Sequence, residues 1–336
     1  MPKTQELDGG EVKIPKVGFF HQGALGDFIL FMPVLDGFAK RQRSVTFELW
    51  TRPSYAGLFY GKPYGIRVHS CEASFWEALF RDDAWMDVPI PEHLESCDAF
   101  FWIGQEKGRA LVERLQRRLP FPVHWIRSFP GREGEKAVTQ FLVEQFAALG
   151  RAVEEMLPSV VVAPEVSQEV AAWLSARGIQ HREFLIVHIG SGGLGKVWPL
   201  GRWQGLLSYV FGQVHRPVVF LLGPADEAFA PFVSWISGRY DWPVAKDFPL
   251  ELVAAFLSAS ILYVGCDSGI SHLAAALGVP SVVIVGPTDS EVWAPQGDHV
   301  HLLKDHWQKE EILAWDPNQD VDLDPSILRK FEAFLK

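Results

Sequence analysis

Short apolar runs rich in β-branched and aromatic residues alternate with amphipathic segments along the first half of the chain. The runs predict strands at 17–23, 44–51, 66–71, 98–104 and 123–129. The segments between them predict helices at 25–40, 106–119 and 135–149. Strands that alternate with helices in this way are typical of βαβ units, which build a parallel sheet.

The alternation stops at 156–168, which contains two prolines and no helical period, and it starts again beyond that segment. We interpret this segment as a connection between two domains, 1–157 and 158–336. Near-continuous apolar runs predict further strands at 184–190, 217–223, 261–267 and 281–287. Helices are predicted at 202–212, 226–238, 250–260, 270–278 and 325–336. Strands this apolar are typically buried on both faces of a parallel sheet. The pattern therefore predicts an α/β protein of two doubly wound domains, with ligands beyond the carboxyl ends of the strands.

The charge balance limits the class of partner. A net charge of −10 argues against a general nucleic-acid binder, which shows a basic footprint. The charge is also uneven, because residues 1–155 hold 19 basic and 21 acidic residues and residues 156–336 hold 12 and 20. An anionic partner is therefore expected on the first half.

Cysteine usage and apolar stretches indicate the compartment. Cys71, Cys97 and Cys266 form neither a CxxC pair nor a disulfide framework, which is typical of a reducing compartment. The first 16 residues lack the apolar core of a signal peptide, and the longest mostly apolar stretch, 250–265, is too short to span a bilayer. We expect a cytoplasmic protein, at most peripheral at the inner face of the cytoplasmic membrane.

The segment HQGALGDFILFMP at 21–33 places a Gly-rich turn between a predicted strand and an apolar helix. Gly26 and the glycine before it let the backbone bend tightly next to a ligand. Asp27 lies at the start of the helix, where its carboxylate either acts in catalysis or only caps the helix. The turn alone does not decide between these readings, because it is not a complete GxGxxG motif.

A second Gly-rich loop, in HIGSGGLGKVWPLGRW at 188–203, follows a predicted buried strand and contains Ser191, Gly192 and Lys196. Backbone N–H groups without Cβ atoms and one lysine charge are what a phosphate group needs. The loop is not a Walker A motif, since no Ser or Thr follows the lysine. A flexible surface loop with a solvated lysine is the alternative.

The segment VGCDSGISHLAAALGVPSVVIVGPTD at 264–289 predicts a strand, the turn Asp267-Ser268-Gly269, a helix of small residues and another strand. The first N–H groups of that helix have no partner within the helix and offer an anion site. Asp267 is suited to accept hydrogen bonds from sugar hydroxyls or to cap the helix. His272 is either part of the site or a structural histidine.

In the segment VVFLLGPADE at 218–227, a predicted strand ends in a Gly-Pro turn, and Asp226 and Glu227 follow at the start of a helix. Acidic residues in a first turn commonly only favour the helix dipole. The functional alternative is a carboxylate that binds the hydroxyls of a ribose. No metal-binding pair of acidic residues, no HExxH motif and no GxSxG motif is present.

Taken together and in this order, these motifs resemble the ADP-heptose:lipopolysaccharide heptosyltransferases, glycosyltransferase family 9. The resemblance covers about residues 16–300 and is strongest over 184–297. It implies a GT-B fold of two Rossmann-like domains facing across a cleft. The domain 1–157 would bind the acceptor, the domain 158–336 would bind a nucleotide sugar, and the last helix would pack back on the first domain.

The resemblance also implies roles for individual residues. Asp27 matches the catalytic aspartate, Lys196 the phosphate-contacting lysine and Glu227 a glutamate on the nucleoside ribose. The remaining expected donor-binding residues are Gly26, Ser191, Gly192, Asp267, Ser268, Gly269 and His272. The chain departs from many relatives at Gly23-Ala24-Leu25, where a basic residue is common.

What the resemblance implies is an inverting glycosyltransferase without metal or cofactor, in which Asp27 is the general base. The expected donor is ADP-heptose, and the expected acceptor is an anionic glycolipid or glycan of lipopolysaccharide-core type. Two alternatives stay open: a nucleotide-sugar epimerase or hydrolase on the same architecture, and a non-catalytic GT-B scaffold that binds a nucleotide.

Overall fold

The structure is a computed structural model that describes residues 14–42, 44–83, 85–131, 136–151, 153–154, 157–211, 216–319, 321 and 323–335. The predicted helix at 135–149 and the predicted helices that end at 212 and 336 each include one residue outside these ranges. Most of the N-terminal segment that was compared with a signal peptide also lies outside them.

The first half of the chain forms a parallel sheet in the order β3-β2-β1-β4-β5, within the described residues. Its strands are β1 (Lys16–His21), β2 (Thr46–Thr51), β3 (Gly65–Ser70), β4 (Ala99–Gly104) and β5 (Val123–Arg127). Its helices are α1 (Leu25–Arg41), α2 (Ser74–Phe80), α3 (Glu92–Glu95), α4 (Arg109–Arg118) and α5 (Val138–Ala148), with the 3-10 turns η1 (Pro53–Phe59) and η2 (Glu106–Gly108).

The second half forms another parallel sheet, in the order β11-β10-β9-β6-β7-β8. Its strands are β6 (Leu185–His188), β7 (Val218–Leu222), β8 (Val244–Lys246), β9 (Leu262–Cys266), β10 (Ser281–Val285) and β11 (Val300–Lys304). Its helices are α6 (Pro164–Ser175), α7 (Leu200–Leu206), α9 (Ala230–Tyr240), α10 (Leu250–Ala259), α11 (Gly269–Ala276), α12 (Ser290–Trp293) and α13 (Pro325–Leu335). Short helical turns lie between them: η3 (Leu194–Lys196), the π-helical η4 (Leu207–Phe211), η5 (Pro224–Phe229) and η6 (Lys309–Glu311).

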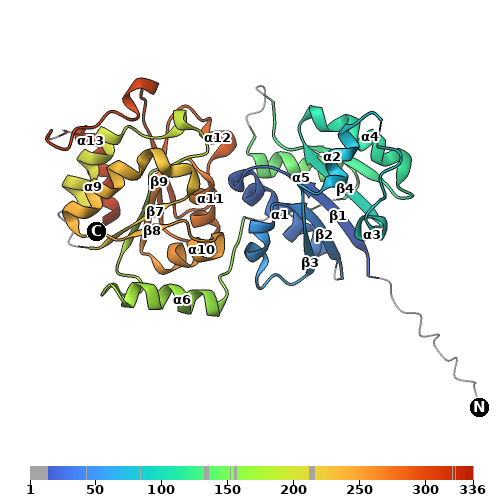
Figure 1. The fold of residues 1–336 in the computed structure, drawn as a ribbon, viewed down its shortest axis with the longest axis horizontal. Coiled ribbons are helices and arrows are strands. Elements are labelled where there is room, and N and C mark those ends of the chain that lie inside the picture. The colour runs from blue at the N-terminus through green and yellow to red at the C-terminus, as the bar shows by residue number, and fades with distance from the viewer. Residues whose placement is uncertain are drawn as a thin grey trace, which may run out of the picture.

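Apolar side chains cover both faces of each sheet, as the sequence predicts. Phe19 and Phe20 are neighbours in β1 and point to opposite faces, into two separate apolar clusters. β7, β9 and β10 are buried along their whole length. The two sheets therefore form two lobes, each with helices on both faces (Figure 1).

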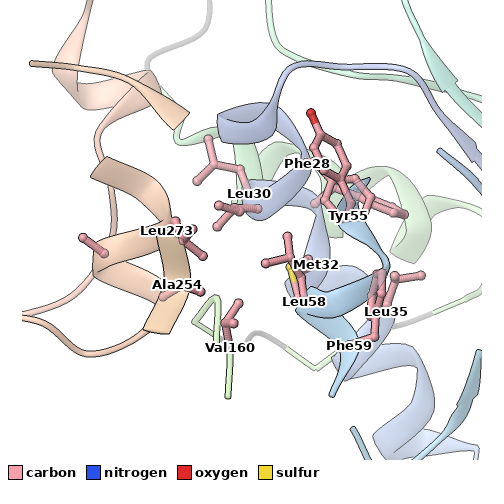
Figure 2. Close-up of a cluster of buried hydrophobic side chains, with 14 of the residues drawn as sticks. Phe28, Leu30, Met32, Leu35, Tyr55, Leu58, Phe59, Val160, Ala254 and Leu273 are labelled. Carbon is pink, nitrogen blue, oxygen red and sulfur yellow. The ribbon is translucent and has the colours of Figure 1, made fainter. Parts of the chain in front are cut away.

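One apolar cluster joins the two lobes. It contains Phe19 of the first sheet, residues of α1, residues of α10 and α11, and Tyr263 of the second sheet. Figure 2 shows this cluster, in which Leu30 of α1 lies on the side of Leu273 of α11. Because α1 and α11 both begin at the carboxyl ends of strands, the contact also brings together the starts of the two helices.

Two sequence expectations need correction. The segment 156–168 is not a plain connection, because α6 begins within it at Pro164, a residue whose fixed φ suits the first turn of a helix. The last helix does not pack back on the first lobe. Ile327 and Phe331 of α13 belong to the cluster around Val187 and Phe220, on the face of the second sheet opposite to α10 and α11. Burial of its apolar face there accounts for its position (Figure 1).

Candidate functional site

The starts of α1 and α11 touch at two glycines. A Cβ on Gly26 would lie 2.9 Å from Cδ2 of His272, and a Cβ on Gly269 would lie 2.7 Å from Cβ of Leu25. Both separations are shorter than contacts that real Cβ atoms make, so larger residues would push the helices apart. The predicted site residues Gly26, Gly269 and His272 thus meet at the contact between the two lobes.

Asp27 lies in the first turn of α1 and is half-buried. Its Oδ2 accepts a hydrogen bond of 3.2 Å from the N–H of Ala24, so the carboxylate does cap the helix. Burial raises the pKa of Asp27 above its ordinary value, while the Ala24 N–H and the charge of Lys196 lower it and the charge of Asp267 raises it further. Three charged residues that are far apart in sequence are therefore within electrostatic reach of one another.

The Gly-rich loop is tied to the turn after β9 by two contacts. Nζ of Lys196 lies 3.0 Å from Oδ2 of Asp267, and Oγ of Ser191 donates to the main-chain oxygen of Asp267 at 2.6 Å. Asp267 is almost fully buried, whereas the Lys196 side chain is 42% exposed. The loop therefore presents a cation at the surface above a buried carboxylate. Gly192 is exposed, and a Cβ there would contact nothing.

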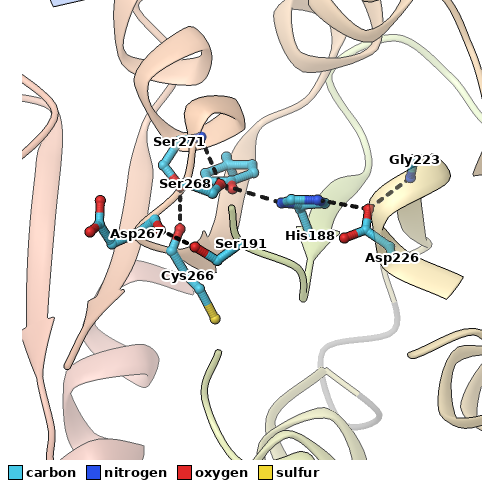
Figure 3. A network of polar contacts seen from close by, with 9 residues as sticks. His188, Ser191, Gly223, Asp226, Cys266, Asp267, Ser268 and Ser271 are labelled. Carbon is cyan, nitrogen blue, oxygen red and sulfur yellow. Dashed lines mark hydrogen bonds and ion pairs between the residues drawn. The ribbon is translucent and has the colours of Figure 1, made fainter. Parts of the chain in front are cut away.

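A buried chain of polar groups lies behind this loop and was not predicted from the sequence (Figure 3). Oδ2 of Asp226 lies 3.2 Å from Nε2 of His188, and Nδ1 of His188 lies 3.4 Å from Oγ of Ser268. Ser268 is the N-cap of α11 and accepts from the N–H of Ser271. Asp226 also accepts from the N–H of Gly223 at 2.7 Å. These hydrogen bonds fix the start of α11 relative to β6 and η5.

The electrostatics of Asp226 fit this structural position. Burial opposes ionisation, but the hydrogen bond and charge of His188 and the Gly223 N–H together lower the pKa of Asp226. Asp226 is thus the buried acidic residue that orders the start of η5, as a helix-terminal carboxylate does. The sequence pattern did not reveal the contact between His188 and Asp226, because the two residues are 38 positions apart.

His272 is buried beside the helix contact, and burial lowers its pKa to about 4. The imidazole is therefore neutral near pH 7 and adds no positive charge to the site. Buried His21, at the end of β1, has its pKa lowered to about 4 by the same cause, and its Nδ1 accepts from the N–H of Gly23.

Glu227 is exposed and lines a separate pocket at the carboxyl ends of β7 and β8, together with Lys246 and Asp247. This pocket shares no lining residue with a second pocket, which Asp27 lines at the ends of β1 and β4. The predicted residues thus form one group around Asp27, Lys196 and Asp267, with Glu227 in a neighbouring pocket of the second lobe.

The described residues contain no group of three His, Cys, Asp or Glu side chains placed to hold a metal ion. Within the same ranges, no helix combines the length and the apolar character that a membrane crossing requires.

Comparison with known proteins gives a family and a fold. The model of the family described as glycosyltransferase family 9 (heptosyltransferase) matches residues 129–319, more than half of the chain. Lipopolysaccharide heptosyltransferase 1 of Salmonella typhimurium is 34% identical over 95 residues. The aligned part is 28% of this chain and 29% of that protein, so this match spans less than a third of the relative.

Solved structures match over nearly the whole length. A glycosyl transferase family 9 structure from Veillonella parvula is 17% identical with a TM-score of 0.73, covering 97% of this chain and 98% of that chain. The E. coli heptosyltransferase WaaC with ADP is 18% identical with a TM-score of 0.66, covering 95% of this chain and 99% of that chain. These similarities confirm the predicted fold, two parallel α/β lobes of the GT-B type.

Proposed function

The chain belongs to glycosyltransferase family 9, and on that premise we propose that it is an inverting, metal-independent glycosyltransferase. In this proposal it moves heptose from ADP-heptose to a glycan acceptor of lipopolysaccharide-core type. The first lobe holds the acceptor and the second lobe holds the donor. An acceptor carried by a glycolipid would bring the protein to the inner face of the cytoplasmic membrane.

The single observation that carries the proposal is the electrostatic proximity of Asp27 to Lys196 and Asp267. Asp27 belongs to the first lobe, whereas the other two belong to the second. A glycosyltransferase needs two groups on opposite sides of the anomeric carbon. A base takes the proton of the attacking acceptor hydroxyl, and a cation stabilises the leaving diphosphate. The helix contact at Gly26 and Gly269 supports such an arrangement, because it brings the two sides together.

Asp27 is the proposed general base. The acceptor hydroxyl loses its proton to the Asp27 carboxylate as its oxygen attacks the anomeric carbon of the donor sugar. The raised pKa makes this carboxylate a stronger base than an ordinary aspartate. Attack from the face opposite the leaving diphosphate, in a single displacement, inverts the anomeric configuration.

The leaving diphosphate gains negative charge as the glycosidic bond breaks. Lys196 and the N–H groups at the start of α11 are proposed to stabilise that charge. Ser191, Ser268 and His272 surround this position, with Ser191 holding the loop through the Asp267 carbonyl. Glu227, in the pocket at the ends of β7 and β8, is proposed to bind the ribose. The ADP in the solved E. coli relative supports an adenine nucleotide as the donor's leaving group.

Two other functions fit the same architecture. A nucleotide-sugar epimerase or hydrolase would consume the donor without a second sugar, and a scaffold would bind a nucleotide without turnover. Asp27 and Lys196 are both present, and neither is required by the apolar core, which favours an active transferase.

The test measures release of ADP from ADP-heptose with and without lipopolysaccharide-core acceptors. A transferase releases ADP mainly when the acceptor is present, a hydrolase releases it in both cases, and a scaffold in neither. A thermal-shift series across ADP-, UDP-, GDP- and CDP-sugars identifies the donor base, since a ligand of the native state raises the melting temperature.

A further inference from the structure

We propose that His21 is a positioning residue for Asp27: its ring nitrogen Nδ1 holds the turn between β1 and α1 in the conformation that points the Ala24 N–H at the carboxylate. His21 is the last residue of β1, and Asp27 lies in the first turn of α1. That Asp27 acts as a base rests on the proposed function. The control of its carboxylate by His21 does not.

The imidazole of His21 is fixed by the elements on either side of the turn. The backbone of His21 is aligned with Ile103 of β4 in the sheet. The ring stacks on Phe31 of α1, with centroids 5.1 Å apart and an interplanar angle of 13°, and it meets Phe28 edge-on at 5.4 Å. The residue is buried. The ring therefore has a defined position relative to α1, the helix that carries Asp27.

Two consecutive N–H groups of the turn are bound by the two side chains that flank it. The N–H of Gly23 donates to Nδ1 of His21 at 3.3 Å. The N–H of the next residue, Ala24, donates to Oδ2 of Asp27 at 3.2 Å. Because Gly23 and Ala24 share one planar peptide link, a change of orientation at Gly23 carries over to the N–H that meets the carboxylate.

Gly23 is packed between the two side chains. A Cβ on Gly23 would lie 2.6 Å from Cε1 of His21 and 3.1 Å from Oδ2 of Asp27. Both separations are shorter than ordinary van der Waals contacts, so the imidazole, the turn and the carboxylate lie directly against one another. A larger residue in this place would push the ring away from the N–H or the carboxylate away from the turn.

The protonation state of His21 suits it to accept a hydrogen bond. Burial lowers its pKa to about 4, so the ring is neutral near pH 7. A neutral imidazole has one nitrogen with a proton and one without. Since Nδ1 accepts from Gly23, the proton is on Nε2. Replacing His21 by another neutral residue therefore removes no charge from the surroundings of Asp27 near pH 7.

The Ala24 N–H affects the acid strength of Asp27. Burial raises the pKa of Asp27, and the hydrogen bond from Ala24 is the largest effect that opposes it. The titratable residues around this carboxylate include Lys196, Asp267 and His272 of the second lobe, Tyr55 of η1 and Lys107 of η2. His21 differs from the charged ones because it acts on Asp27 through the turn and not through charge.

Two substitutions separate the acceptor nitrogen from the ring. His21→Phe keeps an aromatic ring on Phe31 and removes the acceptor, whereas His21→Asn loses the ring and keeps an acceptor oxygen at the place of Nδ1. The measurement is the titration of the Asp27 carboxylate by 13C NMR of the full-length protein, with the signal assigned by its loss in Asp27→Asn. His21→Phe should raise the midpoint by about 0.5–1 pH unit, because the Ala24 N–H is no longer held at the carboxylate. His21→Asn should titrate within about 0.3 pH unit of the wild type.

Turnover gives a second readout. In the proposed function, His21→Phe should lower kcat about tenfold at pH 7, since the carboxylate is no longer held toward the acceptor hydroxyl. The Kd for ADP should stay within about twofold of the wild type, because the donor is bound by the other lobe. His21→Asn should recover most of the lost kcat.

Two controls accompany these variants. His124→Phe is the matched substitution, since His124 of β5 also stacks on a phenylalanine, Phe101, with centroids 5.1 Å apart. It should change neither the Asp27 titration nor kcat. A 15N NMR spectrum of the wild type tests the inference without any variant, because Nδ1 of His21 should carry no proton at pH 7.

Three results would overturn the role of His21: a wild-type Asp27 midpoint in His21→Phe, equal midpoints in His21→Phe and His21→Asn, or a proton on Nδ1 at pH 7. Equal midpoints would mean that packing of the ring, or its charge when protonated, controls the carboxylate.

The proposed function fails separately. A protein whose Asp27 titration follows these expectations, but which transfers no sugar from ADP-heptose, would keep the role of His21 and refute the transferase. An active transferase in which His21→Phe changes neither kcat nor the Asp27 midpoint would keep the function and refute the role of His21.

Discussion

The ammonium of Lys196 lies 3.0 Å from the carboxylate of Asp267, across 71 residues of sequence. This ion pair joins the Gly-rich loop after β6 to the turn that starts α11. Lys196 therefore has two roles to separate: it neutralises a buried carboxylate of its own protein, and in the proposed function it faces a diphosphate.

Replacing Lys196 by alanine should weaken ADP binding by about 1.5–3 kcal/mol, because a charge-assisted hydrogen bond is lost. It should also lower the melting temperature, because Asp267 stays buried without its cation. Calorimetry with ADP and thermal unfolding measure the two effects. Lys304→Ala, an exposed lysine of β11, is the control and should change neither. Unchanged affinity and turnover would remove Lys196 from the donor site.

The two roles separate in a double variant. Lys196→Ala combined with Asp267→Asn leaves no uncompensated charge, so the melting temperature should return toward the wild-type value while ADP affinity stays low.

Asp27→Asn should lower kcat by at least about 100-fold, because the amide cannot accept the acceptor's proton. Its oxygen can still accept from the Ala24 N–H, so we expect little change in melting temperature and a donor Kd within about threefold of the wild type. Steady-state kinetics, calorimetry and thermal unfolding on one preparation give all three values.

A pure capping role for Asp27 predicts a different pattern. Asp27→Ala would then lose stability but keep near-normal turnover in the folded fraction. Asp324→Ala is the matched control, since Asp324 caps α13 through the N–H of Ser326, away from the site. Wild-type turnover by Asp27→Asn with its true acceptor would refute the proposed mechanism.

Chelation should leave the transferase active. The leaving diphosphate is proposed to be stabilised by Lys196 and the start of α11, so EDTA should change the rate by less than about twofold. Activity that EDTA abolishes and magnesium or manganese restores would contradict the proposed leaving-group chemistry.

The pH dependence of kcat should report the neighbours of Asp27. The base acts when ionised, so its raised pKa places the acidic limb of the profile above the ordinary value of 3.8. Lys196→Ala removes a charge that lowers this pKa and should move the limb to higher pH. Asp267→Asn removes a charge that raises it and should move the limb to lower pH. Shifts of the same sign would show that these charges do not act on the base.

Stability should fall in acid through the buried histidines. The pKa of His21 is about 4 in the folded protein and 6.5 in the unfolded chain, so the unfolded chain binds more protons between these values. The contribution is fully present above pH 6.5 and is lost as the pH falls to 4, by about 3 kcal/mol. The free energy of unfolding, measured by urea unfolding at a series of pH values, should fall more steeply with decreasing pH in the wild type than in His21→Gln between pH 6.5 and 4. Between pH 7 and 8 the two proteins should show the same pH dependence.

The strands that are apolar throughout were predicted from the sequence, because a short run of consecutive apolar residues is typical of a strand buried on both faces of a parallel sheet. The apolar pattern missed β8 and β11, which are short edge strands with mixed exposure along their length. It also missed α6, since prolines there suggested a loop although Pro164 starts the helix.

In the candidate site, motifs identified Asp27, Lys196 and Asp267, which the structure brings within electrostatic reach of one another. The contact of His188 with Asp226 depends on how two segments 38 residues apart pack against each other, and no local spacing in the sequence encodes it.

The contact of α1 with α11 has a consequence for exchanging halves between relatives. A hybrid protein would join the first lobe of one family member to the second lobe of another. Here the junction would lie near residue 157, but compatibility would be decided at Gly26 against His272 and at Gly269 against Leu25. A second lobe with a bulkier residue at position 269, or a first lobe with one at position 26, would push α1 and α11 apart even if both lobes fold. In the proposed function, this would separate Asp27 from Lys196 and the start of α11. Recombination between relatives should therefore succeed only among pairs that keep both positions small.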